Sequence, residues 1–239
     1  MSSPEANWNR VWDRAAQSGS YSYLHSRLER SMDKVGYFIS NGVLFRDGDR
    51  VLEAGCGDGL VLLSLLRLFE IQGHGLDISV SAKERAEELM EIEGNRFSFD
   101  IGDILAMPYP DDHFDKIVCL GVIEHFHDPT QSLREVYRVL KPGGQVIMMT
   151  PNKKSLGVLD RKVKQWMGTW PFGYQTEYSP AELEGLMTAQ HFQIRKREGL
   201  LRRRLPHDNR TVRVIGNFDR LINLFVEDWG FFSYVFATK

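Results

Sequence analysis

Three glycines and two acids crowd into one short stretch of this 239-residue chain. The stretch reads Glu53-Ala54-Gly55-Cys56-Gly57-Asp58-Gly59 and follows residues 50–54, whose length and composition predict a strand. Glycines let the backbone turn sharply and let a ligand approach the main chain closely. Carboxylates beside the loop would repel a pyrophosphate, and they suit a ligand that carries a positive sulfonium and an ammonium group.

The loop differs from the dinucleotide-binding fingerprint G-x-G-x-x-G. Its third glycine would fall at position 60, where this chain has Leu60. The spacing and the local acids therefore disfavour an NAD(P)-dependent oxidoreductase. For the loop alone, a tight strand-to-helix turn without any ligand remains an open alternative.

Two further acids follow the next two predicted strands. Asp77 comes after residues 73–76, and Asp103 comes after residues 96–99. A carboxylate at the first position can accept hydrogen bonds from both ribose hydroxyls, and one at the second from the exocyclic amine of adenine. Because the carboxyl ends of parallel strands share one crevice, we expect these acids and Glu53 to face the same ligand.

The elements that must position these residues alternate along the chain. Predicted strands at 50–54, 73–76, 96–99, 114–120 and 145–150 are separated by predicted helices at 60–69, 79–91 and 129–140. This alternation predicts a mostly parallel sheet with helices on both sides. Two helices are expected before it, the second with an apolar stripe that includes Val35 and Ile39. A helix within 153–168, another from Ser179, and strands at 192–197 and 231–237 are expected after it.

Four motifs follow one another in the central part of the chain: VLEAGCGDG (51–59), GLDIS (75–79), GDILAMPYPDDHFDKIVCLGVIEHFHDP (102–129) and EVYRVLKPGGQVIMMTPN (135–152). Together they resemble the class I methyltransferases, especially the group that contains ubiquinone/menaquinone-biosynthesis and other small-molecule methyltransferases. The resemblance implies a Rossmann-like, doubly wound α/β fold. Its seven-stranded, mostly parallel sheet would have an antiparallel last strand and helices on both faces. It also implies S-adenosyl-L-methionine as methyl donor, with S-adenosyl-L-homocysteine as product.

The resemblance assigns cofactor binding residue by residue. The matching positions are Glu53, Gly55, Cys56, Gly57, Gly59, Asp77, Ile78, Asp103, Ile104, Leu120 and Gly121. The family usually has Asp where this chain has Glu53, and the longer side chain keeps the charge. The whole of 1–239 is then one domain, with a helical cap (1–45), a cofactor-binding core (46–151), a substrate-lid insertion (152–178) and a C-terminal completion of the sheet (179–239).

Methyl transfer is an in-line displacement that depends mainly on alignment, and a base is needed only if the acceptor must lose a proton. His125 is the predicted base, because its ordinary pKa lies near neutrality and it follows the segment that lines the cofactor. The alternative is that Glu124 and His125 only shape the crevice or cap the next helix. The histidines form no ligand cluster, so no metal is expected.

Four residues are predicted to bind the methyl acceptor: Tyr21, Glu124, Gln175 and Tyr178. Residues 151–214 hold 13 basic and 6 acidic residues, although the whole chain has a net charge of −2. Basic and aromatic residues together suit an anionic or lipid-like small molecule, a membrane surface or RNA; a mobile lid with a solvated face is the alternative. An RNA methyltransferase and a non-catalytic S-adenosylmethionine-binding protein that regulates a partner remain alternatives, although no nucleic-acid-binding module is recognisable.

Compartment is predicted from what the sequence lacks. Two cysteines without metal-ligand spacing, no signal peptide and no long apolar run favour a cytoplasmic protein without a transmembrane segment.

Overall fold

The computed structural model describes residues 3–17, 21–93, 97–201, 217–218, 220–226 and 228–239. Its helices are α1 (Pro4–Gln17), α2 (Tyr21–Ser40), α3 (Leu60–Leu66), α4 (Val80–Glu93), the 3-10 turn η1 (Ile123–His125), α5 (Thr130–Val139), α6 (Gly157–Trp166) and α7 (Pro180–Thr188). Its strands are β1 (Arg50–Ala54), β2 (Gln72–Asp77), β3 (Ser98–Ile101), β4 (Phe114–Leu120), β5 (Leu140–Pro151), β6 (Gln193–Leu200) and β7 (Phe232–Thr238). Residues 217–218 and 220–223 are also helical.

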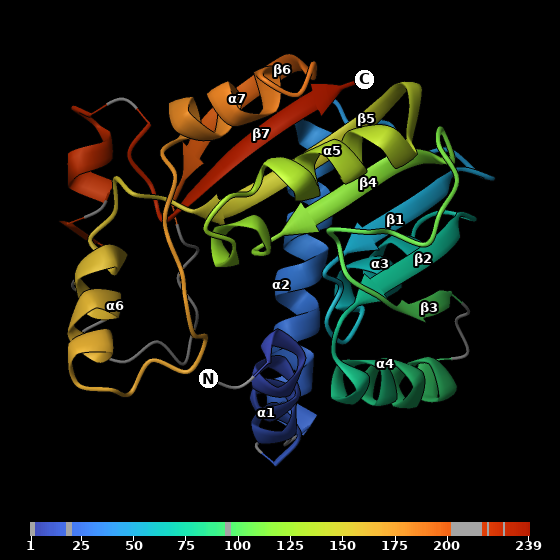
Figure 1. The fold of residues 1–239 in the computed structure, drawn as a ribbon, viewed down its shortest axis with the longest axis horizontal. Coiled ribbons are helices and arrows are strands. Elements are labelled where there is room, and N and C mark those ends of the chain that lie inside the picture. Colours follow the sequence, from blue (N-terminus) through green and yellow to red (C-terminus); the bar gives the residue numbers. More distant parts are fainter. Residues whose placement is uncertain (1–2, 18–20, 94–96, 202–216, 219, 227) are drawn as a thin grey trace.

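The seven strands form one sheet in the order β3-β2-β1-β4-β5-β7-β6 (Figure 1). Strands β1 to β5 pair in parallel, and β7 runs antiparallel to both β5 and β6. The predicted doubly wound α/β fold with an antiparallel last strand is therefore confirmed. The register sets Ala54 beside Leu76 and Cys119, so the ends of β2, β1 and β4 lie together at one edge.

Both faces of the sheet are buried, and alternate residues of each strand serve opposite faces. Leu52, Cys119 and Met148 belong to one core cluster, which α5 and α7 cover. Their chain neighbours Val51 and Val118 belong to the other, which α2 and α3 cover. This is the pattern of period two expected of strands that are buried on both sides.

Helix α2 is rotated slightly from its predicted position. Val35 and Phe38 are fully buried against the sheet, whereas Ile39 is 40% exposed. The predicted stripe was wrong at Ile39. Phe38 and Ile39 lie about 60° and about 40° from Val35 around a helix, on opposite sides of it, and only the side of Phe38 packs against the sheet. Helix α6 is also shorter than the predicted 153–168.

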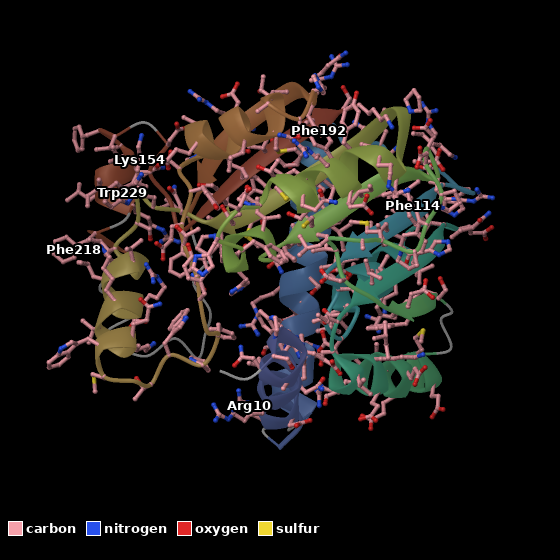
Figure 2. The ribbon with its side chains drawn as sticks, in the orientation of Figure 1. Arg10, Phe114, Lys154, Phe192, Phe218 and Trp229 are labelled. Atoms are coloured by element: carbon pink, nitrogen blue, oxygen red, sulfur yellow. The ribbon has the colours of Figure 1, made fainter. Side chains whose placement is uncertain are left out.

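Side chains fill the space between these layers (Figure 2). Helix α7 begins with a capping box: the Ser179 hydroxyl accepts a hydrogen bond from the Glu182 amide, and the Glu182 carboxylate accepts one from the Ser179 amide. This is the start predicted from the sequence. No described helix is long and apolar enough to cross a lipid bilayer.

Candidate functional site

The glycine loop joins β1 to α3, and its backbone requires glycine. Gly55, Gly57 and Gly59 all have positive φ, between 54° and 72°, which other L-residues rarely adopt. A Cβ atom at Gly57 would lie 2.2 Å from the ring of Trp12, so α1 packs directly on the loop. The Gly55 amide donates a hydrogen bond of 2.7 Å to the Leu76 carbonyl and so holds the loop at the end of β2.

Asp77, at the end of β2, is built into the same loop. One carboxylate oxygen accepts a hydrogen bond of 2.8 Å from the Gly57 amide, and the other accepts one of 3.0 Å from the Ser79 amide. Each carboxylate oxygen has a second lone pair. Asp77 can therefore hold the loop and still accept hydrogen bonds from two ribose hydroxyls, so the residues present fit the nucleoside part of S-adenosylmethionine. Burial raises the pKa of Asp77.

The three residues predicted to border the adenine differ in their exposure to solvent. Asp103 is exposed after β3, and its carboxylate accepts a hydrogen bond of 2.9 Å from the Leu105 amide. Ile104 is buried in the core with Leu76 rather than in an open site. Ile78, next to Asp77, is half-buried.

Asp58 has a charged partner within the protein. Its carboxylate is buried and forms a two-point ion pair with the Arg27 guanidinium of α2, with one contact at 3.0 Å. The same guanidinium lies 5.5 Å from the centre of the Trp12 ring. The charge of Asp58 is therefore neutralised by a residue 31 positions away in the sequence, and the pair fastens α2 to the loop.

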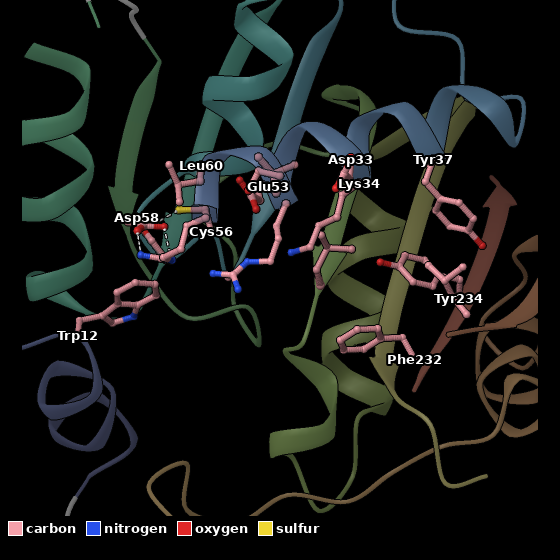
Figure 3. A pocket seen from close by; sticks show the side chains of 18 of the residues that line it. Trp12, Asp33, Lys34, Tyr37, Glu53, Cys56, Asp58, Leu60, Phe232 and Tyr234 are labelled. Carbon is pink, nitrogen blue, oxygen red and sulfur yellow. Dashed lines mark hydrogen bonds and ion pairs between the residues drawn. The ribbon is translucent and has the colours of Figure 1, made fainter. Parts of the chain in front are cut away.

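A cavity of about 560 Å³ opens beside the loop (Figure 3). It is lined by Trp12, Arg27, Arg30, Ser31, Asp33, Lys34, Tyr37, Glu53, Gly55, Cys56, Gly57, Asp58, Leu60, Val61, Leu120, Leu200, Leu201, Phe232 and Tyr234. In Figure 3 the loop and Trp12 form one end, Tyr37, Phe232 and Tyr234 form the other, and the Lys34 side chain points between them. Its volume lies in the range typical of small-molecule sites.

Two ionisable side chains, Glu53 and Lys34, lie in the middle of this cavity (Figure 3). Glu53, at 5% exposure, accepts a hydrogen bond of 3.2 Å from the Leu62 amide. Burial raises the pKa of Glu53 to about 8, against the opposing effect of the Lys34 charge. Burial lowers the pKa of Lys34. A ligand with an ammonium and a carboxylate would find a partner for each here.

Glu124 and His125 follow β4 and form the turn η1. Glu124 is 2% exposed, and its Oε2 atom has no hydrogen-bond partner among the described residues. Burial raises its pKa to about 8. Its other carboxylate oxygen would lie 3.4 Å from a Cβ atom at Gly121, so the carboxyl lies directly beside the end of β4.

His125 is held by segments from both ends of the sequence. Its Nδ1 atom lies 2.8 Å from the Tyr174 carbonyl, and its ring meets the Trp8 ring edge-on at 4.9 Å. Since a carbonyl can only accept, Nδ1 carries the proton, and in the neutral ring Nε2 is left to accept. Burial lowers the pKa of His125, which favours this neutral form.

The insertion lies across the ends of β4 and β7. The Thr176 amide donates a hydrogen bond of 2.9 Å to the Glu124 carbonyl. The Tyr178 carbonyl accepts one of 2.6 Å from the Ser233 hydroxyl. Gln175 and Tyr178 are half-buried beside Glu124 and His125. The side chain of Tyr21, the remaining predicted substrate residue, lies outside the described residues.

Sequence analysis missed the helical side of the cavity. Arg27, Arg30 and Lys34 recur at spacings of three and four along α2, so they share one face of that helix. That polar stripe was the available signal. Leu200 and Phe232 gave no signal, because β6 and β7 reach the cavity only through the pairing of distant strands. No group of three metal-binding side chains is found in the part of the chain that the structure describes.

Comparison with known families accounts for the core of the molecule. Residues 52–148 match the sequence profile of a family described as a methyltransferase domain. This segment is therefore similar to methyltransferase domains. The match runs from within β1 to within β5 and includes the carboxyl ends of β1, β2, β3 and β4.

Relatives with similar sequences match this chain over part of their own length. The chain is 33% identical to ajmaline N-methyltransferase of Rauvolfia serpentina over 50% of this chain and 44% of that protein. It is 30% identical to the ubiquinone biosynthesis O-methyltransferase of Pseudomonas putida (strain W619) over 62% of this chain and 61% of that protein. The chain thus spans about half the length of the curated relatives it matches.

Solved structures support the fold. A structure from Thermotoga maritima, described as an S-adenosylmethionine-dependent methyltransferase and possible histamine N-methyltransferase, matches with a TM-score of 0.65 and 19% identity, over 99% of this chain and 100% of that one. At this identity the likeness concerns the arrangement of the elements alone.

Proposed function

We propose that this protein transfers a methyl group from S-adenosylmethionine to a small-molecule acceptor. The observation that carries the proposal is the convergence of Glu53, Asp77 and Gly121 from the ends of three adjacent strands around one glycine loop, which lines the cavity together with Glu53. The bound cofactor supplies a methyl group already activated by a positive sulfur. The task of the protein is to bind and align the reactants, which can lower a barrier by roughly 7–11 kcal/mol in favourable cases.

The roles of the cofactor residues follow from their partners. Asp77 would accept from the ribose, and Asp103 with Ile78 and Ile104 would border the adenine. Glu53, Gly55, Cys56, Gly57 and Gly59, with Leu120 and Gly121, would surround the methionine part. Glu53 would pair with its ammonium, and Lys34 suits its carboxylate, since the two side chains lie within the same cavity.

The acceptor would occupy the part of the site remote from the nucleoside. Tyr37, Phe232 and Tyr234 make that end of the cavity aromatic, which supports an acceptor with a flat or apolar body. The relatives named for ajmaline and ubiquinone biosynthesis also support a small-molecule acceptor. RNA stays a second candidate only because of the basic residues between 151 and 214.

His125 is the proposed base for an acceptor that must lose a proton. Its Nδ1 atom is held by the Tyr174 carbonyl, so Nε2 is the atom that would take the proton. Glu124 has one buried oxygen without a partner among the described residues and would bind the acceptor beside His125, together with Gln175, Tyr178 and Tyr21. Glu124 and His125 are not among the residues that line the cavity, so the acceptor would extend from its aromatic end to the turn η1.

Calorimetry with S-adenosylmethionine and with NAD tests the cofactor. We expect binding of the first alone, and binding weakened strongly by Asp77→Ala and by Gly57→Arg. If both variants bind S-adenosylmethionine as the parent does, the site is wrongly placed. A screen for methylated products across quinols, fatty acids, sugars and RNA then tests the acceptor class.

His125→Ala tests the base. General base catalysis contributes about 10²–10⁴-fold, so we expect a loss of that order in kcat with unchanged affinity for S-adenosylmethionine. Full activity would leave His125 only the structural role of joining Trp8 to the insertion.

A further inference from the structure

Helix α6 turns an apolar stripe toward solvent. Leu159, Val163, Trp166 and Met167 follow one another at spacings of four, three and one, and are 61%, 54%, 89% and 60% exposed. A helix in a water-soluble domain normally packs such a stripe against a core. Here the buried contact on the other side is polar, because the Arg161 guanidinium forms an ion pair with Glu177.

A second segment does the same. Within residues 217–226, Phe218, Leu221, Leu224 and Phe225 are 56%, 55%, 74% and 81% exposed. Together with the α6 stripe, these side chains make up eight of the fifteen large apolar side chains that the structure describes as exposed. We call the eight residues the α6 patch.

The chain segments that carry the two parts of the α6 patch, α6 and residues 217–226, are joined by contacts near their ends. The Gly230 amide donates a hydrogen bond of 3.3 Å to the Lys154 carbonyl, and a Cβ atom at Gly157 would lie 2.6 Å from the Phe231 ring. Figure 1 shows α6 and the helical residues 217–218 and 220–223 at one end of the molecule, away from the sheet. In Figure 2 Phe218, Lys154 and Trp229 lie at this end.

The charge around the patch is positive. Residues 153–167 and 217–226 hold six basic and two acidic residues, although the whole chain carries a net charge of −2. Lys162, Lys164 and Arg220 are exposed. Exposed Trp, Phe and Leu beside Lys and Arg are the features by which a peripheral helix enters the headgroup region of an anionic bilayer.

We propose that the α6 patch docks this protein on the surface of an anionic lipid bilayer. Trp166 and Phe225, the most exposed aromatic side chains of the patch, would enter the headgroup boundary, while Lys162 and Lys164 meet lipid phosphates. Positive charge around an apolar surface favours this occupant over a second copy of the chain, whose own patch would be repelled.

Two neighbouring aromatic residues link α6 to the lining of the cavity. Phe231 contacts Gly157 of α6 on one side and meets the Phe232 ring at 4.8 Å on the other. Phe232 lines the cavity together with Leu200 and Leu201. An amphiphilic acceptor could therefore pass from the bilayer into the aromatic end of the site. This consequence rests on the proposed function, whereas the docking itself does not.

Co-sedimentation with vesicles tests the docking. We expect the protein to bind phosphatidylcholine vesicles that contain phosphatidylglycerol at least about tenfold more tightly than vesicles of phosphatidylcholine alone, and to lose this preference at high salt. Trp166→Ser with Phe225→Ser should weaken binding at least about tenfold, and Lys162→Glu with Lys164→Glu should abolish the preference for anionic lipid. Leu44→Ser is the matched control, since Leu44 is 58% exposed outside the patch, and should bind as the parent does.

The proposal is overturned if anionic vesicles are not bound, or if the two patch variants bind them as the parent does. It is also overturned if the patch instead holds a dimer, seen as a concentration-dependent mass that Trp166→Ser with Phe225→Ser removes, or if RNA is bound and vesicles are not. Calorimetry with S-adenosylmethionine on the same samples separates the two proposals. Normal cofactor binding without vesicle binding refutes only the docking, and the reverse result refutes only the proposed function.

Discussion

Replacing the buried Glu124 by Gln should change how stability depends on pH. Burial raises the pKa of Glu124 from an ordinary value of 4.5 to about 8. Between these values the unfolded chain has released the proton while the folded protein retains it, so stability is lost as pH rises through this window. Ionising the carboxyl in the folded protein would cost about 5 kcal/mol, at 1.36 kcal/mol for each pH unit.

An experiment at two pH values measures only the part of this free-energy cost that falls between them. From about pH 5.5 to about pH 8.5, the parent protein should lose up to about 3 kcal/mol that Glu124→Gln does not lose. Glu53 also has a pKa raised by burial to about 8, but it is present in both proteins and cancels in the comparison.

Urea unfolding followed by circular dichroism at the two pH values gives the required difference. Glu88→Gln is the matched control, because Glu88 is exposed on α4 and the substitution removes the same charge. The reasoning is refuted if Glu124→Gln and the parent change in parallel with pH, within about 0.5 kcal/mol.

Three further changes test the loop and its partners. Asp77→Asn should weaken S-adenosylmethionine binding at least about tenfold in calorimetry, because hydrogen bonds to a charged group contribute about 1.5–3 kcal/mol. If the variant and the parent bind S-adenosylmethionine equally well, Asp77 is not the ribose ligand. Gly57→Ala should destabilise the protein by more than the ~1–2 kcal/mol that a left-handed backbone costs, since the new Cβ meets Trp12. In urea unfolding, adding Trp12→Ala should recover the excess, and purely additive effects of the two substitutions would contradict that contact. Arg27→Met should lower the free energy of unfolding, measured in urea, by about 3–5 kcal/mol, because it leaves the buried Asp58 without its partner. A decrease below about 1 kcal/mol would mean that the ion pair does not fasten α2 to the loop.

The order of the elements could be predicted because local patterns decide it. A nearly continuous run of apolar residues indicated β4, and Ser179-Pro180-Ala181-Glu182 indicated the start of α7. Boundaries were less certain: β3 covers Ser98–Ile101 instead of 96–99. The chain positions of the loop, Asp77 and Asp103 were also readable, because each directly follows a predicted strand.

Partners that are distant in the sequence could not be predicted. Nothing near Asp58 indicates that Arg27 neutralises it, and nothing near Glu124 indicates that one of its oxygens is buried without a partner. Desolvation and ion pairing depend on which elements pack together, and so they set the charge of these acids only once the chain has folded.

By itself the sequence determined the alternation of strands and helices and the glycines that the loop requires, because backbone geometry and hydrophobic period act over a few residues. Tertiary structure alone decided that α2 supplies Lys34 to the cavity and that α6 turns its apolar face outward. An amphipathic pattern predicts a helix with two faces, but which face meets solvent depends on the neighbours that packing brings to it.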